Sequence, residues 1–170
     1  MNQNNYNDIP PVVSSEDKYI SSELVPEGIY AIVMANYPEY AISIEDEHSD
    51  ILTIKKYKES INQLFVIKRS LDDEENCYEI SSVVSGKVFD VEAEQKFNGV
   101  KVIQYERNGG ENQKWNIVQK EKENYYIVSK SSGFFLEGET ERNMINLYIW
   151  QCNGNQNQIF KFIQVFLDNK

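Results

Sequence analysis

Three short stretches of the sequence place two amide side chains beside an aromatic ring. Each is an Asn-Gln pair with an aromatic residue two positions after the glutamine: Asn62, Gln63 and Phe65; Asn112, Gln113 and Trp115; Asn157, Gln158 and Phe160. Amides both donate and accept hydrogen bonds, and aromatic rings offer large apolar faces, so this set suits recognition and the fixing of turns. Its threefold occurrence predicts an internal repeat.

Residues that form nucleophilic or metal sites are scarce. The two cysteines, Cys77 and Cys152, are too few for a disulfide framework, and we expect free thiols. The single histidine, His48, lies in an acidic stretch while Cys77 lies in a strand-like run, which disfavours a Cys-His pair. The acidic run 72–75 lacks the ligand-and-glycine spacing of a calcium loop and is expected to be a solvated turn. We therefore expect no catalytic residue, no metal site and no cofactor.

Composition excludes several classes of partner. The chain has 170 residues, a formal charge of −10 and 41% hydrophobic residues, which is typical of one domain with a proper core. Because like charges repel, nucleic acid and acidic membrane surfaces are not expected as partners. No apolar run approaches the roughly 20 residues of a spanning helix, and residues 1–13 lack the charged and apolar segments of a signal peptide. We expect neither membrane insertion nor a signal peptide in this chain.

A second marker keeps the same register as the Asn-Gln pairs. Tyr30, Tyr78 and Tyr126 each lie in a strand-like run and are spaced 48 and 48 residues apart. The glutamine of each pair follows its tyrosine after 33, 35 and 32 residues. Two independent markers in one register indicate three pseudo-repeats of about 45–48 residues.

Each repeat is predicted to consist of short strands. In the second repeat, β-branched and aromatic residues separated by glycine turns predict strands at Tyr78–Ser82, Lys87–Val91, Val100–Tyr105 and Trp115–Gln119. The stretch 50–63 also has helical spacing of Lys and Glu, but the repeat favours a strand there. Four strands per repeat, closed with threefold symmetry, predict an all-β barrel. Residues 1–24 show no clear period and are expected to form a flexible N-terminal arm, with the folded domain over residues 25–170.

The second repeat resembles the ricin B-chain type of lectin repeat. It reads SGKVFDV and then NGVKVIQYERNGGENQKW, which matches the turns, strands and Gln-x-Trp ending of that family. The resemblance extends over residues 25–166 and implies a β-trefoil. It also implies that Trp115, Phe65 and Phe160 face a shared core while the neighbouring amides fix the turn.

The resemblance implies binding residues in two of the repeats. Lectins of this family bind sugars through a carboxylate, an aromatic ring and an amide, which satisfy hydroxyl groups and the apolar face of a pyranose. By position, the second repeat supplies Asp90, Tyr105 and Asn112, with Gln113 steadying Asp90, and the third supplies Glu137, Trp150, Asn157 and Gln158.

Some positions depart from the family pattern. Ile103 and Tyr148 stand where a glutamine is usual, so sugar choice at both sites is open. The first repeat has Ser43 at the carboxylate position and Lys55 at the ring position, so we expect it to be structural. The sequence therefore predicts two sugar sites at most, with the second repeat the stronger if the short aspartate matters more than the larger ring.

The function implied by the resemblance is a carbohydrate-binding lectin for galactose-type sugars or glycans, without enzymatic activity. It is expected to act outside the cell at glycosylated surfaces, with a toxin or another complex component as a possible partner protein. The alternative is a protein-binding β-trefoil that binds no sugar. A glycosidase is disfavoured because Asp90 and Glu137 belong to different repeats, too far apart to act as a catalytic pair.

Overall fold

A computed structural model describes residues 24–70, 77–139 and 146–167 of the protein. Except for Leu24, the expected N-terminal arm lies outside these residues, as does the acidic run 72–75. The chain is all-β, with strands β1 (Gly28–Met34), β2 (Tyr40–Ile44), β3 (Leu52–Lys56), β4 (Phe65–Arg69), β5 (Tyr78–Ser82), β6 (Val88–Val91), β7 (Val100–Tyr105), β8 (Trp115–Glu121), β9 (Asn124–Ser129), β10 (Phe135–Gly138), β11 (Leu147–Trp150) and β12 (Phe160–Gln164).

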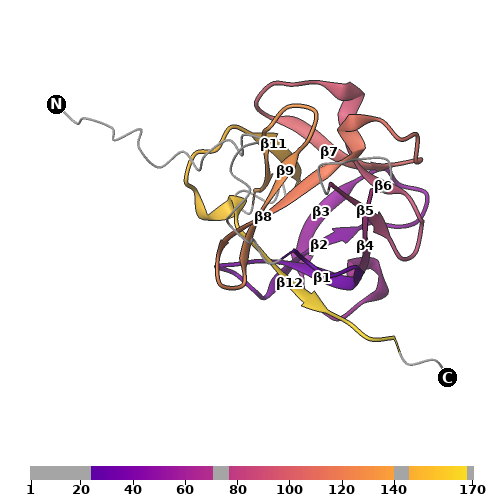
Figure 1. Ribbon diagram of the computed structural model, residues 1–170. Helices are drawn as coiled ribbons and strands as arrows, with labels where there is room; N and C mark the ends of the chain where they lie inside the picture. Colours follow the sequence, from indigo (N-terminus) through magenta and orange to yellow (C-terminus); the bar gives the residue numbers. More distant parts are fainter. Residues whose placement is uncertain (1–23, 71–76, 140–145, 168–170) are drawn as a thin grey trace.

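Six of the strands close into a barrel (Figure 1). Antiparallel pairing runs from β1 to β4, β5, β8, β9 and β12, and β12 pairs with β1 again through the register Ile32↔Phe162. Closure leaves these strands without a free edge, which removes the exposed backbone groups that promote aggregation. The first and last strands therefore lie side by side although they are far apart in the sequence.

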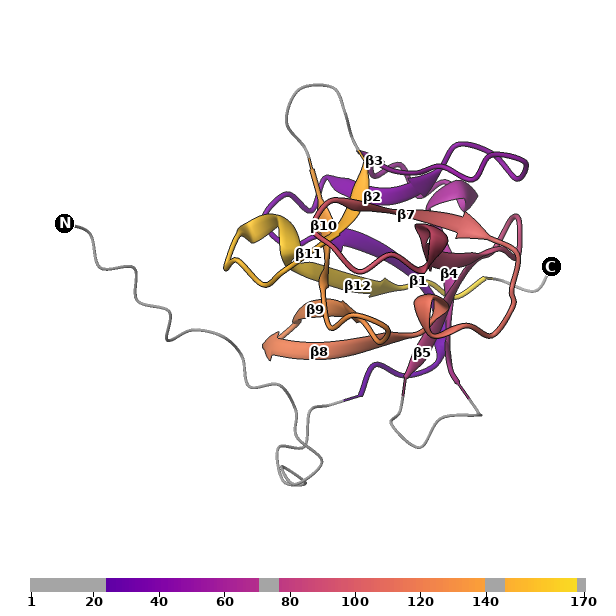
Figure 2. The same cartoon turned by 90° about the horizontal axis from the view of Figure 1, so that it is seen from above.

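The other six strands form three hairpins, β2–β3, β6–β7 and β10–β11. Figure 2 shows the hairpin strands β2, β3, β7, β10 and β11 gathered on one side of the barrel strands. The hairpins contact one another through the pairing of β7 with β11 and through the bridges Ile51↔Ile103 and Thr53↔Asn146. Barrel and hairpins together are the β-trefoil that the family resemblance implied.

The aromatic residues of the three repeated stretches lie at the centre of the core. Trp115, Phe65 and Phe160 are each 0% exposed, as predicted. Fully burying a large apolar side chain contributes roughly 1.5–3 kcal/mol, so the trio is a major part of the stability. The indole Nε1 of Trp115 donates to the backbone oxygen of Phe89 at 3.2 Å, which satisfies its one polar group. The Gln-x-aromatic stretch is therefore a folding device in every repeat.

One expected element differs from the structure. The strand predicted over residues 50–63 ends at Lys56, and Ile61–Gln63 form a short 3-10 turn, η1. Equivalent turns, η3 (Glu111–Gln113) and η4 (Gln156–Gln158), precede Trp115 and Phe160, and a further turn, η2, spans Glu92–Glu94. The amide residues of the repeat lie in the three equivalent turns, which explains why neither strand nor helix period extends through them. Within the described ranges, the chain has no helix long and apolar enough to cross a membrane.

Candidate functional site

Strand pairing places the same three positions together in every hairpin. The ring position lies opposite the residue two before the carboxylate position, with the pairs Lys55↔Ala41, Tyr105↔Val88 and Trp150↔Phe135. The positional equivalence of Ser43, Asp90 and Glu137 is thus a property of the fold as well as of the sequence. What differs between the repeats is the chemistry at those positions.

The glutamine of each repeat closes the loop that carries it. Gln113 Oε1 accepts from the backbone nitrogen of Asn108 at 2.8 Å, while its Nε2 donates to the backbone oxygen of Glu106 at 2.9 Å. The same two bonds recur at Gln63, with Lys58 and Lys56, and at Gln158, with Asn153 and Gln151. We call this pair of hydrogen bonds the glutamine bracket. It holds the side-chain amide in the same orientation relative to the hairpin in all three repeats.

In the second repeat, the two amides hold a buried carboxylate. Asn112 Nδ2 donates to Asp90 Oδ1 at 3.1 Å, and Gln113 Nε2 donates to Asp90 Oδ2 at 2.8 Å. Asp90 is 4% exposed, and this burial raises the pKa of its carboxyl group although the two amide hydrogen bonds act in the opposite direction. We call Asp90, Tyr105, Asn112 and Gln113 the second-repeat cluster.

Each oxygen of Asp90 keeps capacity for another hydrogen bond, because a carboxylate has about four acceptor positions. The Asn112 Oδ1 atom is buried and has no hydrogen-bond partner among the residues that the structure describes. Tyr105, at the end of β7, is 47% exposed and presents its ring to solvent. The cluster therefore combines a fixed carboxylate, an unsatisfied amide oxygen and an open aromatic ring.

The third repeat holds its carboxylate with three amides. Asn157 Nδ2 donates to Glu137 Oε1 at 3.1 Å, and Gln158 Nε2 and Asn153 Nδ2 donate to Oε2 at 2.9 and 3.0 Å. The sequence prediction did not include Asn153. It follows from the repeat, because Asn153 occupies the position of Asn108 and the longer glutamate reaches it. We call Glu137, Trp150, Asn153, Asn157 and Gln158 the third-repeat cluster.

The third-repeat cluster is the more open of the two. Glu137 and Asn157 are partly exposed, whereas Asp90 is almost covered. Trp150 is 39% exposed, and one edge of its ring rests on the turn before β7, where a Cβ atom at Gly99 would lie 3.3 Å from Trp150 Cζ3. The turn therefore supports the ring from one side and leaves the other side accessible.

The first repeat has the same three positions in its hairpin but lacks the carboxylate and the aromatic ring of the other two repeats. Ser43 is buried, and Lys55 Nζ pairs with Glu45 Oε2 at 2.6 Å. The structure nevertheless has a hollow of about 390 Å³ here, lined by Ser43, Ile44, Glu45, Lys55, Lys56, Lys58, Ser60, Asn62 and Gln63. The sequence predicts a structural role for this repeat and contains no sign of a hollow.

The other candidate groups do not assemble. Cys77 is buried, Cys152 is partly buried, and the two are not bonded to each other. His48 is exposed and its Nε2 lies 3.4 Å from Glu47 Oε1. Among residues 24–70, 77–139 and 146–167, no three His, Cys, Asp or Glu side chains gather in a way that would hold a metal ion.

Comparison with known proteins agrees with the geometry. Residues 61–143 match the family model of the ricin-type beta-trefoil lectin domain-like family. No curated protein matches the sequence. Residues 61–143 thus belong to a ricin-type β-trefoil lectin-like domain, and the barrel and hairpins show the β-trefoil fold over the described residues.

Solved structures share the fold. The designed threefold-symmetric protein ThreeFoil is 27% identical with a TM-score of 0.71, over 81% of this chain and 99% of that one. The Polyporus squamosus lectin, bound to the epitope Neu5Acα2-6Galβ1-4GlcNAc, is 24% identical with a TM-score of 0.73, over 83% of this chain and 50% of that one. A mosquitocidal holotoxin is 15% identical with a TM-score of 0.74, over 84% of this chain and 18% of that one. The chain thus spans half or less of the last two proteins, whose likeness concerns the fold alone.

Proposed function

We propose that the protein is a carbohydrate-binding lectin with one site at the second-repeat cluster and one at the third-repeat cluster. The observation that carries the proposal is the repeated geometry of a carboxylate held by an Asn-Gln amide pair in a hairpin with an exposed aromatic ring. Such a carboxylate accepts hydrogen bonds from adjacent hydroxyl groups, while the ring covers the apolar face of a pyranose. Two sites on one domain would let a multivalent glycan bind more tightly than a single sugar.

The preferred ligand in this proposal is a galactose-type sugar. The lectin of Polyporus squamosus was solved with a glycan that contains galactose, which supports the choice of sugar as a hypothesis for this chain. The structural likeness to a mosquitocidal holotoxin supports the further hypothesis that the domain serves as the targeting part of a toxin assembly at glycosylated cell surfaces. The proposal includes no bond-breaking step, because a glycosidase needs two carboxyl groups at one scissile bond, whereas Asp90 and Glu137 lie in the separate hairpins β6–β7 and β10–β11.

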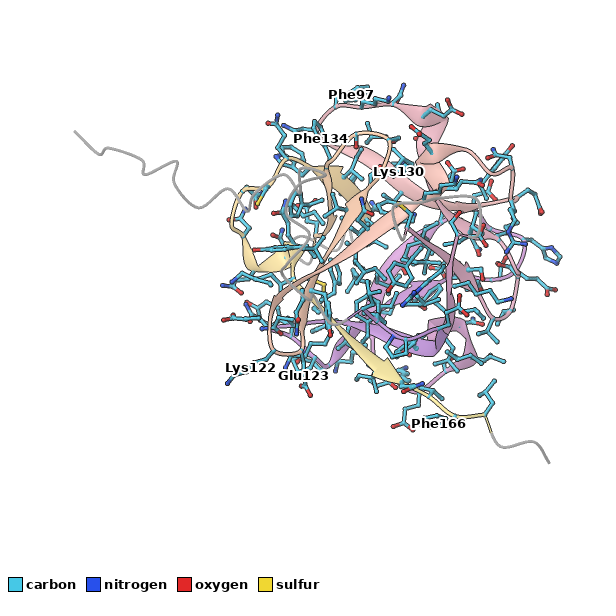
Figure 3. The ribbon with its side chains drawn as sticks, in the orientation of Figure 1. Phe97, Lys122, Glu123, Lys130, Phe134 and Phe166 are labelled. Carbon is cyan, nitrogen blue, oxygen red and sulfur yellow. The ribbon has the colours of Figure 1, made fainter. Side chains whose placement is uncertain are left out.

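The test is a titration of the isotope-labelled protein with lactose, followed by amide chemical shifts, with sucrose as a sugar that lacks galactose. We expect lactose to shift amides of η3 and of η4, and Asp90→Ala and Glu137→Ala each to abolish one of the two groups. Glu123→Ala is the matched control, since Glu123 is an exposed acid in the turn between β8 and β9, where Figure 3 labels it. If the double variant Asp90→Ala/Glu137→Ala still binds lactose with the same shifts, the proposed sites are wrong.

A further inference from the structure

The glutamine of the first repeat lacks one hydrogen bond that its two counterparts make. In those counterparts Nε2 donates to a carboxylate as well as to a backbone oxygen, with Gln113 to Asp90 at 2.8 Å and Gln158 to Glu137 at 2.9 Å. Gln63 Nε2 donates to the backbone oxygen of Lys56 at 2.8 Å, and within the described part of the chain it has no second acceptor. Gln63 is 3% exposed, and its Nε2 makes one described hydrogen bond where the Nε2 atoms of its counterparts make two. The second amide hydrogen is therefore available to an acceptor that the described part of the chain does not supply.

The second amide hydrogen of Gln63 faces a space that a carboxylate side chain fills in the other two repeats. Because the glutamine bracket is the same in all three repeats, the second amide hydrogen of Gln63 is directed to the place of the missing carboxylate. The short side chain of Ser43 does not reach it, since its hydroxyl donates to the backbone oxygen of Ile44 at 3.2 Å. The hollow of about 390 Å³ opens at this position and has the size of a small-molecule site.

The lining of the hollow is cationic in a strongly acidic protein. Three lysines, Lys55, Lys56 and Lys58, line it together with a single carboxylate, Glu45. Lys55 is neutralised by Glu45 at 2.6 Å, whereas Lys58 makes no ion pair with any described residue. In a chain of formal charge −10, this local excess of positive charge favours an anionic ligand at the hollow.

We infer that the first-repeat hollow binds an acidic sugar, whose own carboxylate occupies the place of the missing side-chain carboxylate. Its oxygens accept from Gln63 Nε2 and from Asn62 Nδ2, which at present makes only a long contact of 3.4 Å to the backbone oxygen of Glu45. Lys58 supplies the counter-charge. The hollow is larger than a carboxylate alone and carries further polar groups such as Ser60, which suits a hexuronic acid. The inference rests on the proposed function only in taking the ligand to be a sugar.

The experiment is an amide-shift titration of the full chain with galacturonic acid, its methyl ester, galactose and acetate. We expect galacturonic acid to shift amides of Ser43, Lys58 and Gln63, and its uncharged ester and galactose to leave them in place. Added salt should weaken this binding, because the attraction is between charges. Equal shifts with the ester would overturn the role of the carboxylate, and equal shifts with acetate at the same concentration would overturn the assignment to a sugar.

A substitution that restores the family carboxylate provides the second test. Ser43→Asp places a carboxylate where Asp90 stands in the second repeat, so it should bind the Gln63 amide and abolish the galacturonic acid shifts. Lys58→Gln should weaken binding by about two- to fivefold. The control is Lys122→Gln, because Lys122 is exposed in the β8–β9 turn labelled in Figure 3. Retention of the shifts in Ser43→Asp would overturn the inference.

The two proposals fail in different ways. Lactose is expected to shift amides of η3 and η4, whereas galacturonic acid is expected to shift amides of β2 and η1. The shifted amides therefore identify which site binds the sugar. Loss of lactose binding with retention of the first-repeat shifts would overturn the proposed galactose sites and support the acidic-sugar site. Absence of the first-repeat shifts with normal lactose binding would overturn only the acidic-sugar site.

Discussion

Gln113 donates a hydrogen bond from Nε2 to Asp90 Oδ2 over 2.8 Å, inside the protein and across 23 positions of sequence. The same nitrogen donates to the backbone oxygen of Glu106, so one amide group fixes both the loop and the carboxylate. Trp115, two residues on, is buried in the core. The orientation of the proposed binding carboxylate is therefore coupled to the packing of the barrel.

Replacing Gln113 with alanine should reduce the stability of the protein. The change removes the bonds to Asp90, Glu106, Asn108 and Gly109 and leaves a buried carboxylate with one amide donor fewer. Because a net hydrogen bond contributes about 1 kcal/mol and one to a charged group about 1.5–3 kcal/mol, we expect a fall of about 3 kcal/mol in the free energy of unfolding. Urea denaturation followed by tryptophan fluorescence measures it.

Gln63→Ala is the matched control for this prediction. Gln63 makes the same loop contacts with Lys56 and Lys58 but donates to no carboxylate among the described residues. Its removal should therefore cost less than that of Gln113, and the exposed Gln95→Ala should change stability by about 0.5 kcal/mol at most. Equal losses at Gln63 and Gln113 would mean that the bond to Asp90 contributes nothing.

The stability contribution of Asp90 should depend on pH with a defined sign. Burial raises the pKa of its carboxyl group in the folded protein, so folding favours the protonated form. The contribution is fully present below the pKa of the unfolded chain and is lost as the pH rises through the higher pKa of the folded state. The free energy of unfolding of the wild type, relative to that of Asp90→Asn, should fall as the pH is raised through this window. Urea denaturation of both proteins at several pH values measures the difference, and a difference that rises with pH would contradict the pKa shift.

Much of the fold was predictable because its determinants are local and repeated. The strands Tyr78–Ser82 and Val100–Tyr105 have the bounds expected from alternating apolar residues and glycine turns. The burial of Trp115 was implied by the resemblance of its repeat to the ricin B-chain type. The extent of β3 was less predictable, because Lys and Glu occur at helical spacing in this segment, whereas the loop after Lys56 is fixed by hydrogen bonds to the side chain of Gln63.

The candidate site was predictable in its residues but not in its environment. The family resemblance, carried through the repeat register, assigned Asp90 and Glu137 as candidates, yet their different exposures depend on how the hairpins pack. The hollow of the first repeat arises because a side chain is missing opposite Gln63, and such a vacancy is defined only by the atoms around it. In the sequence, a serine in place of an aspartate indicates the loss of a site, whereas in the structure it leaves a hollow beside Gln63, whose Nε2 makes one hydrogen bond fewer than its counterparts.

Exposure predicts that the third-repeat cluster binds neutral sugars more strongly than the second. Glu137 and the ring of Trp150 are both accessible, while Asp90 is only 4% exposed, which argues against the sequence-based preference for the second repeat. Removing a carboxylate that accepts charge-assisted hydrogen bonds costs about 1.5–3 kcal/mol, or about 10- to 150-fold in affinity. Glu137→Ala should therefore lower the affinity for lactose more than Asp90→Ala does, as measured by calorimetry or amide shifts. The reverse order would mean that ligand binding uncovers Asp90.

The loops before Gln63 and Gln113 share a backbone position with a positive φ angle. Gly109, four residues before Gln113, has φ +77°, and Glu59, four residues before Gln63, has φ +56°. Both loops therefore need a left-handed backbone conformation at this position, but the first repeat has a glutamate there instead of a glycine. A Cβ at Gly109 would meet no atom within 4 Å, so Gly109→Ala carries only the conformational cost of about 1–2 kcal/mol. Glu59→Gly removes that cost, partly offset by the roughly 0.5–1 kcal/mol of added freedom in the unfolded chain, and should raise the free energy of unfolding by up to about 1 kcal/mol. Urea denaturation of the two variants should therefore give changes of opposite sign, and a loss of stability in both would show that Glu59 stabilises its loop through side-chain contacts that outweigh its backbone strain.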